Sequence, residues 1–264
     1  MHLGYDGSCY SGWQKQTSAS HTVQGTIEQA LSKVCKRDVS LFGCGRTDTG
    51  VHASQYVTQF DLDEPPAYDL KFRLNKNLPD DIAVFEIIEV KQSWNCRNDA
   101  ISRTYDYFAH WEKDPALAKY SSFYQGLDLN VERMEQVVSL IRHHKDFRAL
   151  CKQADIYEHT VCEISDCRLF VNREQGRLRF SITGNRFLRG MVRYCVSFLL
   201  KVGTGDLSLE EFRQILHQES DLERHAEQKS PALPNGLFLS RVVYPSLEFK
   251  NSHQLIRMLK VGLS

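Results

Sequence analysis

The chain has 264 residues, of which 42% are hydrophobic and 25% are charged. This composition is typical of a globular protein with one large domain or two ordinary ones. The 33 basic residues balance the 33 acidic residues, which excludes a uniformly basic protein but leaves local basic patches open. The N-terminus has no signal-peptide pattern, and no apolar run is long enough to span a bilayer. We therefore expect a cytoplasmic protein that has no membrane partner.

The eight cysteines are scattered, and no two of them form a C-x-x-C pair. This spacing disfavours zinc ribbons and thioredoxin-like redox sites, so we expect reduced, mostly buried thiols. A metal site made by His143, His144 and Cys151 is disfavoured because neighbouring side chains on a helix point in different directions. We expect no metal.

The first hundred residues predict alternating strands and helices. A short strand over residues 2–7 precedes a helix at Val23–Cys35, for which Thr22 is the expected N-cap. The other elements expected here are strands at 39–42, 56–60 and 82–90 and a helix at 68–78, which Pro79 would end.

The segment Gly43–Ala53 contains three glycines, one cation at Arg46 and one carboxylate at Asp48. Glycines at this density predict a tight, shaped loop, and the apolar strand after it would hold the loop rigidly. A carboxylate held on a stiff turn beside an arginine is typical of a reactive site. The alternative is a polar turn between two strands, which short motifs of this kind often are.

Residues 102–108 alternate in a way that places Arg103, Tyr105 and Tyr107 on one face of a strand. An ordinary half-exposed strand would also explain this pattern, because tyrosine is common in strands.

The second half predicts a helix that Asn130 caps and that residues 142–145 end. A capping box at Ser208 and Glu211 predicts another helix, which reaches about Gln218. The other features expected here are strands at 162–171, 177–183 and 237–244, a charged surface segment at 219–229, and turns at 230–236.

The segment Arg186–Val202 has a helical apolar stripe with Arg186, Arg189 and Arg193 on the opposite side. A solvated face is one explanation. However, Arg186 and Arg189 would lie in the first helical turn, where the helix dipole favours anions. We therefore weigh an anionic ligand equally with the solvated face.

Together these segments resemble the tRNA pseudouridine synthase A (TruA) family. The similarity covers residues 5 to about 244, and its motifs occur in the order of the family. They are Tyr5-Asp6-Gly7 with Ser11-Gly12-Trp13-Gln14, Gly45 to Ala53, Arg103-Thr104-Tyr105-Asp106-Tyr107, Asn185-Arg186-Phe187 with Met191-Val192-Arg193, and Gly236-Leu237-Phe238-Leu239.

The resemblance implies a homodimeric enzyme that converts a uridine of tRNA, in the anticodon stem-loop, into pseudouridine without a cofactor. It implies an α/β (α+β) fold with two halves derived from ferredoxin-like units, whose largely antiparallel sheets join across a basic central cleft. We expect these halves at residues 1–108 and 109–245, followed by a peripheral tail at 246–264.

The resemblance also assigns roles to residues. Asp48 matches the catalytic aspartate, and Arg46 matches an arginine that holds the flipped nucleotide. Tyr105 matches a tyrosine that stacks on the target base, and Arg193 matches the partner of the catalytic aspartate. The residues expected to contact RNA are Arg46, Arg103, Arg186 and Arg189.

The chemistry is compatible with these residue types, since a carboxylate can act as a nucleophile or a base without a metal. The covalent route stays open. Two features depart from the family: the first strand is short, and Thr49 stands where alanine is more usual.

Two other functions compete with this one. The segment Asp48-Thr49-Gly50 matches the aspartic-protease signature, but the chain has no second copy to supply the paired aspartate. The alternative is a non-catalytic RNA-binding module, in which Asp48 would be structural.

Overall fold

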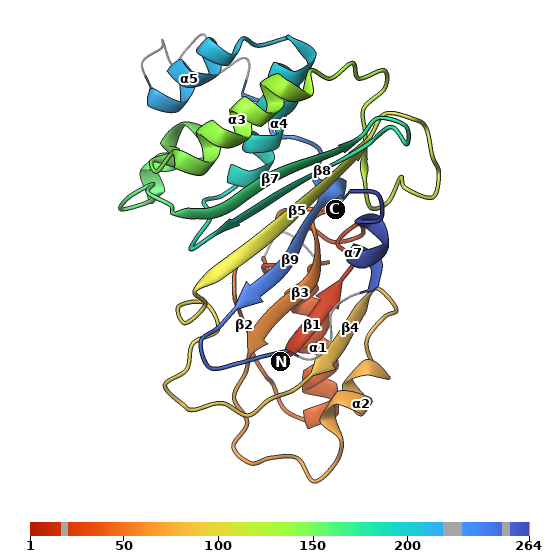
Figure 1. Cartoon of the computed structure of the whole chain (residues 1–264). Coiled ribbons are helices and arrows are strands. Elements are labelled where there is room, and N and C mark those ends of the chain that lie inside the picture. The colour runs from red at the N-terminus through yellow and green to blue at the C-terminus, as the bar shows by residue number, and fades with distance from the viewer. Residues whose placement is uncertain (17–20, 219–228, 250–253, 264) are drawn as a thin grey trace. The chain divides into compact units, whose positions relative to one another are not determined.

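The computed structural model describes residues 1–16, 21–218, 229–249 and 254–263 (Figure 1). They form two structural units, each with its own strands and helices. The first unit contains residues 1–103 and 238–258. The second contains residues 104–237 and the C-terminal residues from Leu259. The first unit is thus completed by residues that follow the second unit in the chain.

The first unit has the strand order β4-β1-β3-β9. Strand β1 (His2–Tyr5) lies between β3 (His52–Gln59) and β4 (Ile82–Glu86) and is antiparallel to both. Strand β9 (Leu237–Val243) is parallel to β3. The two-residue strand β2 (Phe42–Gly43) pairs with the C-terminal end of β3. The buried middle strands of this sheet therefore support the loop between β2 and β3.

Helix α1 (Val23–Cys35) has the predicted bounds and the predicted N-cap, since the side chain of Thr22 accepts a hydrogen bond from Gly25 N. Its apolar stripe is buried, with Ile27 and Leu31 fully inaccessible. Burying side chains of this size stabilises the fold by about 2 kcal/mol each. Helix α2 (Leu70–Asn75) is shorter than predicted and begins after its N-cap, Asp69.

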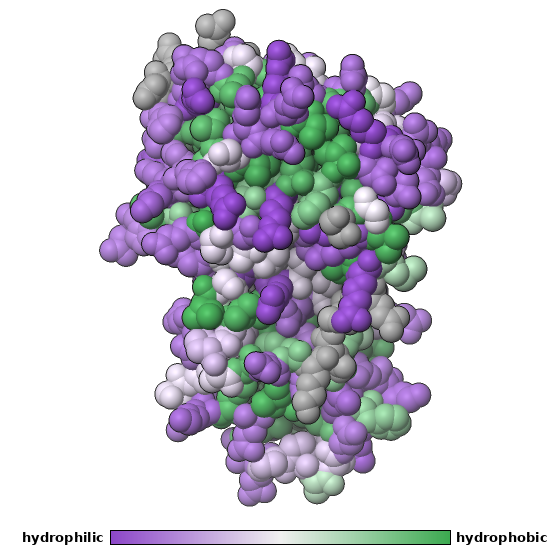
Figure 2. Space-filling model, viewed as in Figure 1, coloured by the Kyte–Doolittle hydropathy of each residue, from purple (hydrophilic) through white to green (hydrophobic). Residues whose placement is uncertain are grey.

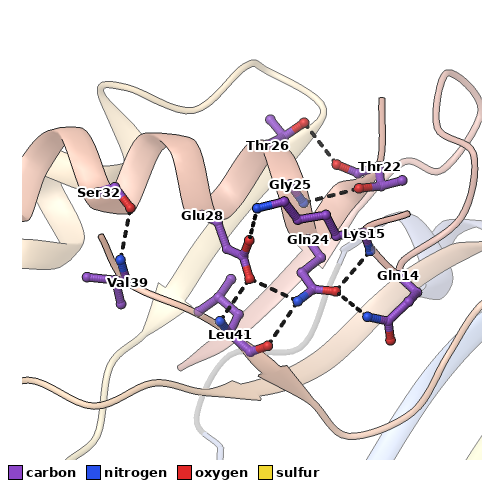
Figure 3. A network of polar contacts seen from close by, with 10 residues as sticks. All are labelled: Gln14, Lys15, Thr22, Gln24, Gly25, Thr26, Glu28, Ser32, Val39 and Leu41. Carbon is purple, nitrogen blue, oxygen red and sulfur yellow. Dashed lines mark hydrogen bonds and ion pairs between the residues drawn. The ribbon is translucent and has the colours of Figure 1, made fainter. Parts of the chain in front are cut away.

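The strand predicted at residues 39–42 was wrong, because only Phe42 belongs to a strand. Side chains of α1 take the backbone groups that would otherwise pair in a sheet (Figure 3). Val39 N donates to Ser32 Oγ at 3.0 Å, and Leu41 N donates to Glu28 Oε1 at 3.0 Å. The segment is extended, but its partner is a helix.

The second unit has the strand order β5-β8-β7. Strands β7 (Ile164–Asn172) and β8 (Arg177–Gly184) form an antiparallel hairpin close to the predicted bounds. Strand β5 (Ser102–His110) lies beside β8, and the short strand β6 (Ser122–Phe123) is parallel to β5. The predicted fold class is confirmed as mixed α/β with mostly antiparallel strand pairs.

Helices α3 (Val131–His143) and α4 (Met191–Thr204) pack together, and α3 lies on β7 (Figure 1). Helix α5 (Leu209–His217) contacts both helices. The predicted caps are confirmed: Asn130 caps α3, and Ser208 and Glu211 form a capping box on α5. Almost all side chains of α4 are buried, so this helix forms the core of the group made by α3, α4 and α5.

The helix predicted at residues 186–202 begins five residues later, at Met191. Gly190, which precedes it, has a φ of 73°, a left-handed conformation that interrupts a helix. The backbone before it has tertiary partners: Arg189 N donates to the hydroxyl of Tyr157, and Arg189 O accepts from Lys152 N. Arg186 and Arg189 are therefore not helical, and the helix-dipole argument fails for both.

Other elements differ in detail. Strand β4 ends at Glu86 and β9 at Val243, both earlier than predicted. The predicted surface segment at 219–229 lies outside the described residues except for Lys229. Elements that the sequence did not predict are strand β6, the 3-10 turns η1 (Phe147–Leu150) and η2 (Ala154–Ile156), and the helix α7 (Gln254–Leu259). The 3-10 turn η3 (Pro234–Gly236) lies within the turns predicted at residues 230–236.

The surface seen in Figure 2 has hydrophilic and hydrophobic residues interspersed. Among the described helices, none is long and apolar enough to cross a membrane.

Candidate active site

The loop Gly43–Val51, called the Asp48 loop below, connects β2 to β3. Its two ends are fixed by backbone hydrogen bonds. Cys44 N donates to Val57 O at 2.9 Å, and Val51 N donates to Asp48 O at 3.1 Å across the turn that leads into β3. The loop is therefore anchored to β3 at its start and closed on itself at its end.

Two buried tyrosines anchor the middle of the loop from neighbouring strands. Tyr56 of β3 donates its hydroxyl to Gly45 O at 2.5 Å. Burial raises the pKa of Tyr56 well above its usual value, which keeps this donor protonated. The hydroxyl of Tyr5, on β1, lies 2.8 Å from Thr47 Oγ1. Thr47 is buried and points into the unit.

The segment Gly12–Trp13 packs under the same part of the loop. Trp13 N donates to Thr47 O at 3.2 Å, and the indole stacks on Tyr56 at a centroid distance of 3.9 Å. Gly12 has a φ of 89°, and a Cβ on it would lie 2.7 Å from Thr47 O. A larger residue at Gly12 would therefore displace the backbone next to Asp48.

Arg103 binds the start of the loop. Its Nη2 donates to Cys44 O at 3.1 Å and to Arg97 O at 2.6 Å, and its Nη1 donates to Ala100 O at 3.1 Å. One guanidinium thus joins the Asp48 loop to the segment at residues 97–100. Arginine suits this task because its planar fork presents several fixed donors.

The side chains of Arg46 and Asp48 flank the inward-pointing Thr47. Arg46 is exposed and Asp48 is half-buried. Around Gly45, the position that a Cβ would occupy is open, with no atom within 4 Å. The loop therefore has a fixed backbone, with Arg46 at the surface of the first unit and Asp48 half-buried.

At the start of β3, the buried ring of His52 stacks on Phe238 at a centroid distance of 4.6 Å. Its Nδ1 accepts a hydrogen bond from Gly7 N at 3.1 Å. His52 therefore ties the end of the loop to both β9 and the residues after β1.

In the second unit, Tyr105 is half-buried on β5. Its ring packs edge-to-face on Phe187 with a centroid distance of 5.1 Å and an interplanar angle of 80°. The neighbouring hydroxyls of Thr104 and Thr183 lie 2.9 Å apart, joining β5 to β8. The orientation of Tyr105 is thus supported on one side by an aromatic side chain.

Arg193 is the third residue of α4, and its guanidinium is oriented by a nearby turn. Its Nε donates to Ala232 O at 2.7 Å, while Ala232 N donates to Arg193 O at 3.0 Å. This reciprocal pair fixes the side-chain stem relative to the helix. Arg193 was predicted on a helix, and this part of the prediction is confirmed.

The segment Asn185–Gly190, called the arginine loop below, carries Arg186 and Arg189. Arg186 Nη1 lies 3.1 Å from His159 Nε2, and Arg189 Nη1 donates to Gln153 Oε1 at 2.9 Å. These partners are an imidazole and an amide. A phosphate that approached either guanidinium would compete with hydrogen bonds to these two side chains, neither of which is a carboxylate.

The predicted site residues are divided between the two units. Arg46, Asp48 and Arg103 belong to the first unit, where Arg103 contacts the loop that carries the other two. Tyr105, Arg186, Arg189 and Arg193 belong to the second unit.

The sequence interpretation did not assign a supporting role to Tyr5, Trp13 or Tyr56, although the first two lie in its motifs. The sequence feature that could have indicated this supporting role is the presence of large aromatic residues close to glycines. In the described part of the chain, no cluster of three His, Cys, Asp or Glu side chains could hold a metal ion.

Comparison with known proteins gives the family. A sequence model of the family described as tRNA pseudouridine synthase matches residues 3–99 and 144–245, which include the Asp48 loop and the arginine loop. A tRNA pseudouridine synthase A from Porphyromonas gingivalis is 41% identical over 255 residues, covering 93% of this chain and 96% of the relative.

Proteins of the same name from Azobacteroides pseudotrichonymphae and Pseudothermotoga lettingae are 36% and 35% identical. These alignments cover 95% and 91% of this chain, and 98% and 96% of the relatives. The chain belongs to the tRNA pseudouridine synthase family.

Proposed function

We propose that this chain converts a uridine of tRNA into pseudouridine, with Asp48 as the catalytic residue. The observation that carries the proposal is the construction of the Asp48 loop. Tyr56, Trp13 and Arg103 hold its carbonyl oxygens, so the backbone that carries the half-buried Asp48 is fixed. A fixed carboxylate suits a reaction in which it acts on one atom of a bound nucleotide.

The reaction is an isomerisation in which atoms are conserved. The bond between the sugar and the uracil nitrogen breaks, the base rotates, and a ring carbon bonds to the sugar in its place. A ring carbon loses a proton, and the ring nitrogen gains one. Asp48 can serve as the nucleophile or as the base that removes the proton.

The target nucleotide has to leave its stack, at a cost of roughly a few kcal/mol. Stacking on Tyr105, whose ring is braced by Phe187, would offset part of this cost. Arg46 is exposed two residues before Asp48 and would hold the flipped nucleotide. Arg193 would pair with the carboxylate of Asp48, as the family resemblance implies.

Arg186 and Arg189 would contact phosphates of the tRNA. The support for this role is that their side-chain partners, His159 and Gln153, are not carboxylates, so an anion could replace them. We propose an indirect role for Arg103 in RNA binding. Its guanidinium donates to carbonyl oxygens, so it contributes to RNA binding through the loop that it holds.

We further propose that the enzyme is a cytoplasmic homodimer and that its target lies in the anticodon stem-loop, as the family resemblance implies. The test is to map pseudouridine in tRNA from cells with and without this chain, and to compare rescue by the wild type and by Asp48→Asn. A pseudouridine lost with the chain and restored only by the wild type supports the proposal. Restoration by Asp48→Asn would leave the RNA-binding alternative standing.

A further inference from the structure

Helix α1 carries a saturated polar network that is separate from the proposed catalytic residues (Figure 3). The amide nitrogen of Gln24 donates to Glu28 Oε1 at 2.9 Å and to Leu41 O at 3.0 Å. Its oxygen accepts from Gln14 Nε2 and from Lys15 N, both at 3.0 Å. Both protons and both lone pairs of the Gln24 side chain are therefore used.

Glu28 completes the network. Its Oε1 accepts from Leu41 N at 3.0 Å, and its Oε2 accepts from Lys15 Nζ at 3.0 Å. Both Gln24 and Glu28 are buried. The N–H and the C=O of Leu41 are thus both paired with side chains of α1, which replaces a neighbouring strand at this point.

One of the two segments that this network joins leads into the Asp48 loop, and the other follows residues that pack against the loop. Leu41 stands directly before β2, which leads into the loop. Lys15 follows the segment Gly12–Trp13, which packs against the carbonyl oxygen of Thr47. Gln24 also donates its backbone N–H to Trp13 O at 3.0 Å. The side chain of Gln24 therefore sets the distance between Leu41, which precedes the Asp48 loop, and the segment Gln14–Lys15, which follows the residues packed against the loop.

We propose that Gln24, with its amide orientation set by Glu28, is a positioning residue for the Asp48 loop. The inference rests on the proposed function of Asp48. Gln24 does not touch the reacting atoms in this proposal; it holds the backbone on which Asp48 is mounted. A displacement of about 1 Å at a reacting group can lower a rate by about 100-fold, so a small change in this spacing should slow the chemistry.

A purely structural role would have a different signature. The network would then stabilise the first unit, and its loss would lower the unfolding temperature without a selective effect on catalysis. Ser32 supplies the matched control. It lies on the same helix, and its hydroxyl accepts from Val39 N at 3.0 Å, so it holds the same extended segment two residues further from the loop.

The experiment compares Gln24→Met with Ser32→Ala. For each variant, the single-turnover rate of pseudouridine formation and the Kd for unmodified tRNA are measured at a temperature where the protein is folded. We expect Gln24→Met to lower the rate by at least about 10-fold with little change in Kd. Ser32→Ala should keep the wild-type rate. A wild-type rate in Gln24→Met, or an equal loss in both variants, would overturn the proposal.

Gln14→Ala covers the case in which Gln24→Met does not fold. It removes only a half-buried donor at the edge of the network, and we expect a rate several-fold lower than that of the wild type with the same Kd. An unchanged rate would contradict the positioning role. Glu28→Gln keeps an oxygen for Leu41 N, so it should lose less activity than Gln24→Met. A wild-type protein without any activity would instead refute the proposed function.

Discussion

The Asp48 loop and the arginine loop are both polar turns, but they are held in different ways. Three groups bind the backbone of the Asp48 loop: the hydroxyl of Tyr56, the peptide N–H of Trp13 and the guanidinium of Arg103. The backbone of the arginine loop is also held, because Tyr157 and Lys152 bind Arg189. In addition, the guanidinium groups of Arg186 and Arg189 contact the side chains of His159 and Gln153.

This difference corresponds to two tasks. A group that reacts with one atom gains from a fixed backbone, because even a small displacement of the reacting group lowers the reaction rate strongly. A group that binds phosphates gains from replaceable partners, because it has to exchange them for the ligand. We therefore expect changes at the Asp48 loop to act on the rate, and changes at the arginine loop to act on affinity.

The largest effect is expected for Asp48→Ala. Loss of a catalytic side chain should lower the single-turnover rate by about 1,000-fold or more, because the rest of the site cannot supply a nucleophile or base. The Kd for tRNA should change little, as measured by filter binding. A variant that still isomerises uridine at the wild-type rate would show that Asp48 is not the catalyst.

Tyr105→Leu tests whether the aromatic face of β5 acts at the reacting base. Stacking on a base is worth about 1–3 kcal/mol, so we expect a loss of about 10- to 100-fold in the rate and a smaller loss in affinity. Phe123→Leu, on another strand of the same unit, is the control for the loss of an aromatic ring. Equal losses of rate and affinity in Tyr105→Leu would contradict a stacking role.

Arg186→Gln and Arg189→Gln test the arginine loop. Each variant should weaken tRNA binding and flatten its salt dependence, with a log–log slope smaller by about 0.9 for each lost contact on duplex regions. Arg168→Gln is the control, because Arg168 is an exposed arginine of the same unit that pairs with Asp166. A slope that does not change in Arg186→Gln or Arg189→Gln would favour the solvated-face interpretation.

The smallest effect is expected for the acid sensitivity of the α1 network. Burial raises the pKa of Glu28, but the hydrogen bonds from Leu41, Lys15 and Gln24 lower it more, so the pKa lies below its ordinary value of 4.5. The unfolded chain therefore binds more protons near this pH. The stabilisation from Glu28 is complete above pH 4.5 and is lost as the pH falls through the pKa of the folded chain.

Urea unfolding of the wild type and of Glu28→Gln at a series of pH values measures this effect. The wild type should be more stable by about 1 kcal/mol at neutral pH, and the difference should shrink as the solution becomes more acidic than pH 4.5. A difference that stays constant down to about pH 3 would mean that the charge of Glu28 contributes nothing.

Much of the fold could be predicted because its signals are local. The N-caps at Thr22, Asn130 and Ser208 mark helix starts correctly, since a cap bonds to backbone groups only two or three residues away. The hairpin of β7 and β8 was likewise visible, because its strands are neighbours in sequence. Short elements such as β6 and α7 had too few residues to produce a pattern.

The errors occurred where distant residues took over backbone hydrogen bonds. Residues 39–41 have the composition of a strand, but side chains of α1 bind Val39 and Leu41. Residues 186–189 continue the apolar stripe of α4, but Tyr157 and Lys152 bind the backbone of Arg189. Periodicity could not reveal either case, because the partners are far away in sequence.

The sequence alone determined which residues are candidates for the chemistry. The glycine-rich segment around Arg46 and Asp48 was recognisable from residue type and spacing, and the resemblance to the family singled out Tyr105 of β5. The tertiary structure alone decided how the Asp48 loop is held, because Tyr5, Trp13, Tyr56 and Arg103 reach it from four different parts of the chain. Residue type sets what a side chain can do chemically, whereas the hydrogen bonds that hold its backbone in place are made only when the chain folds.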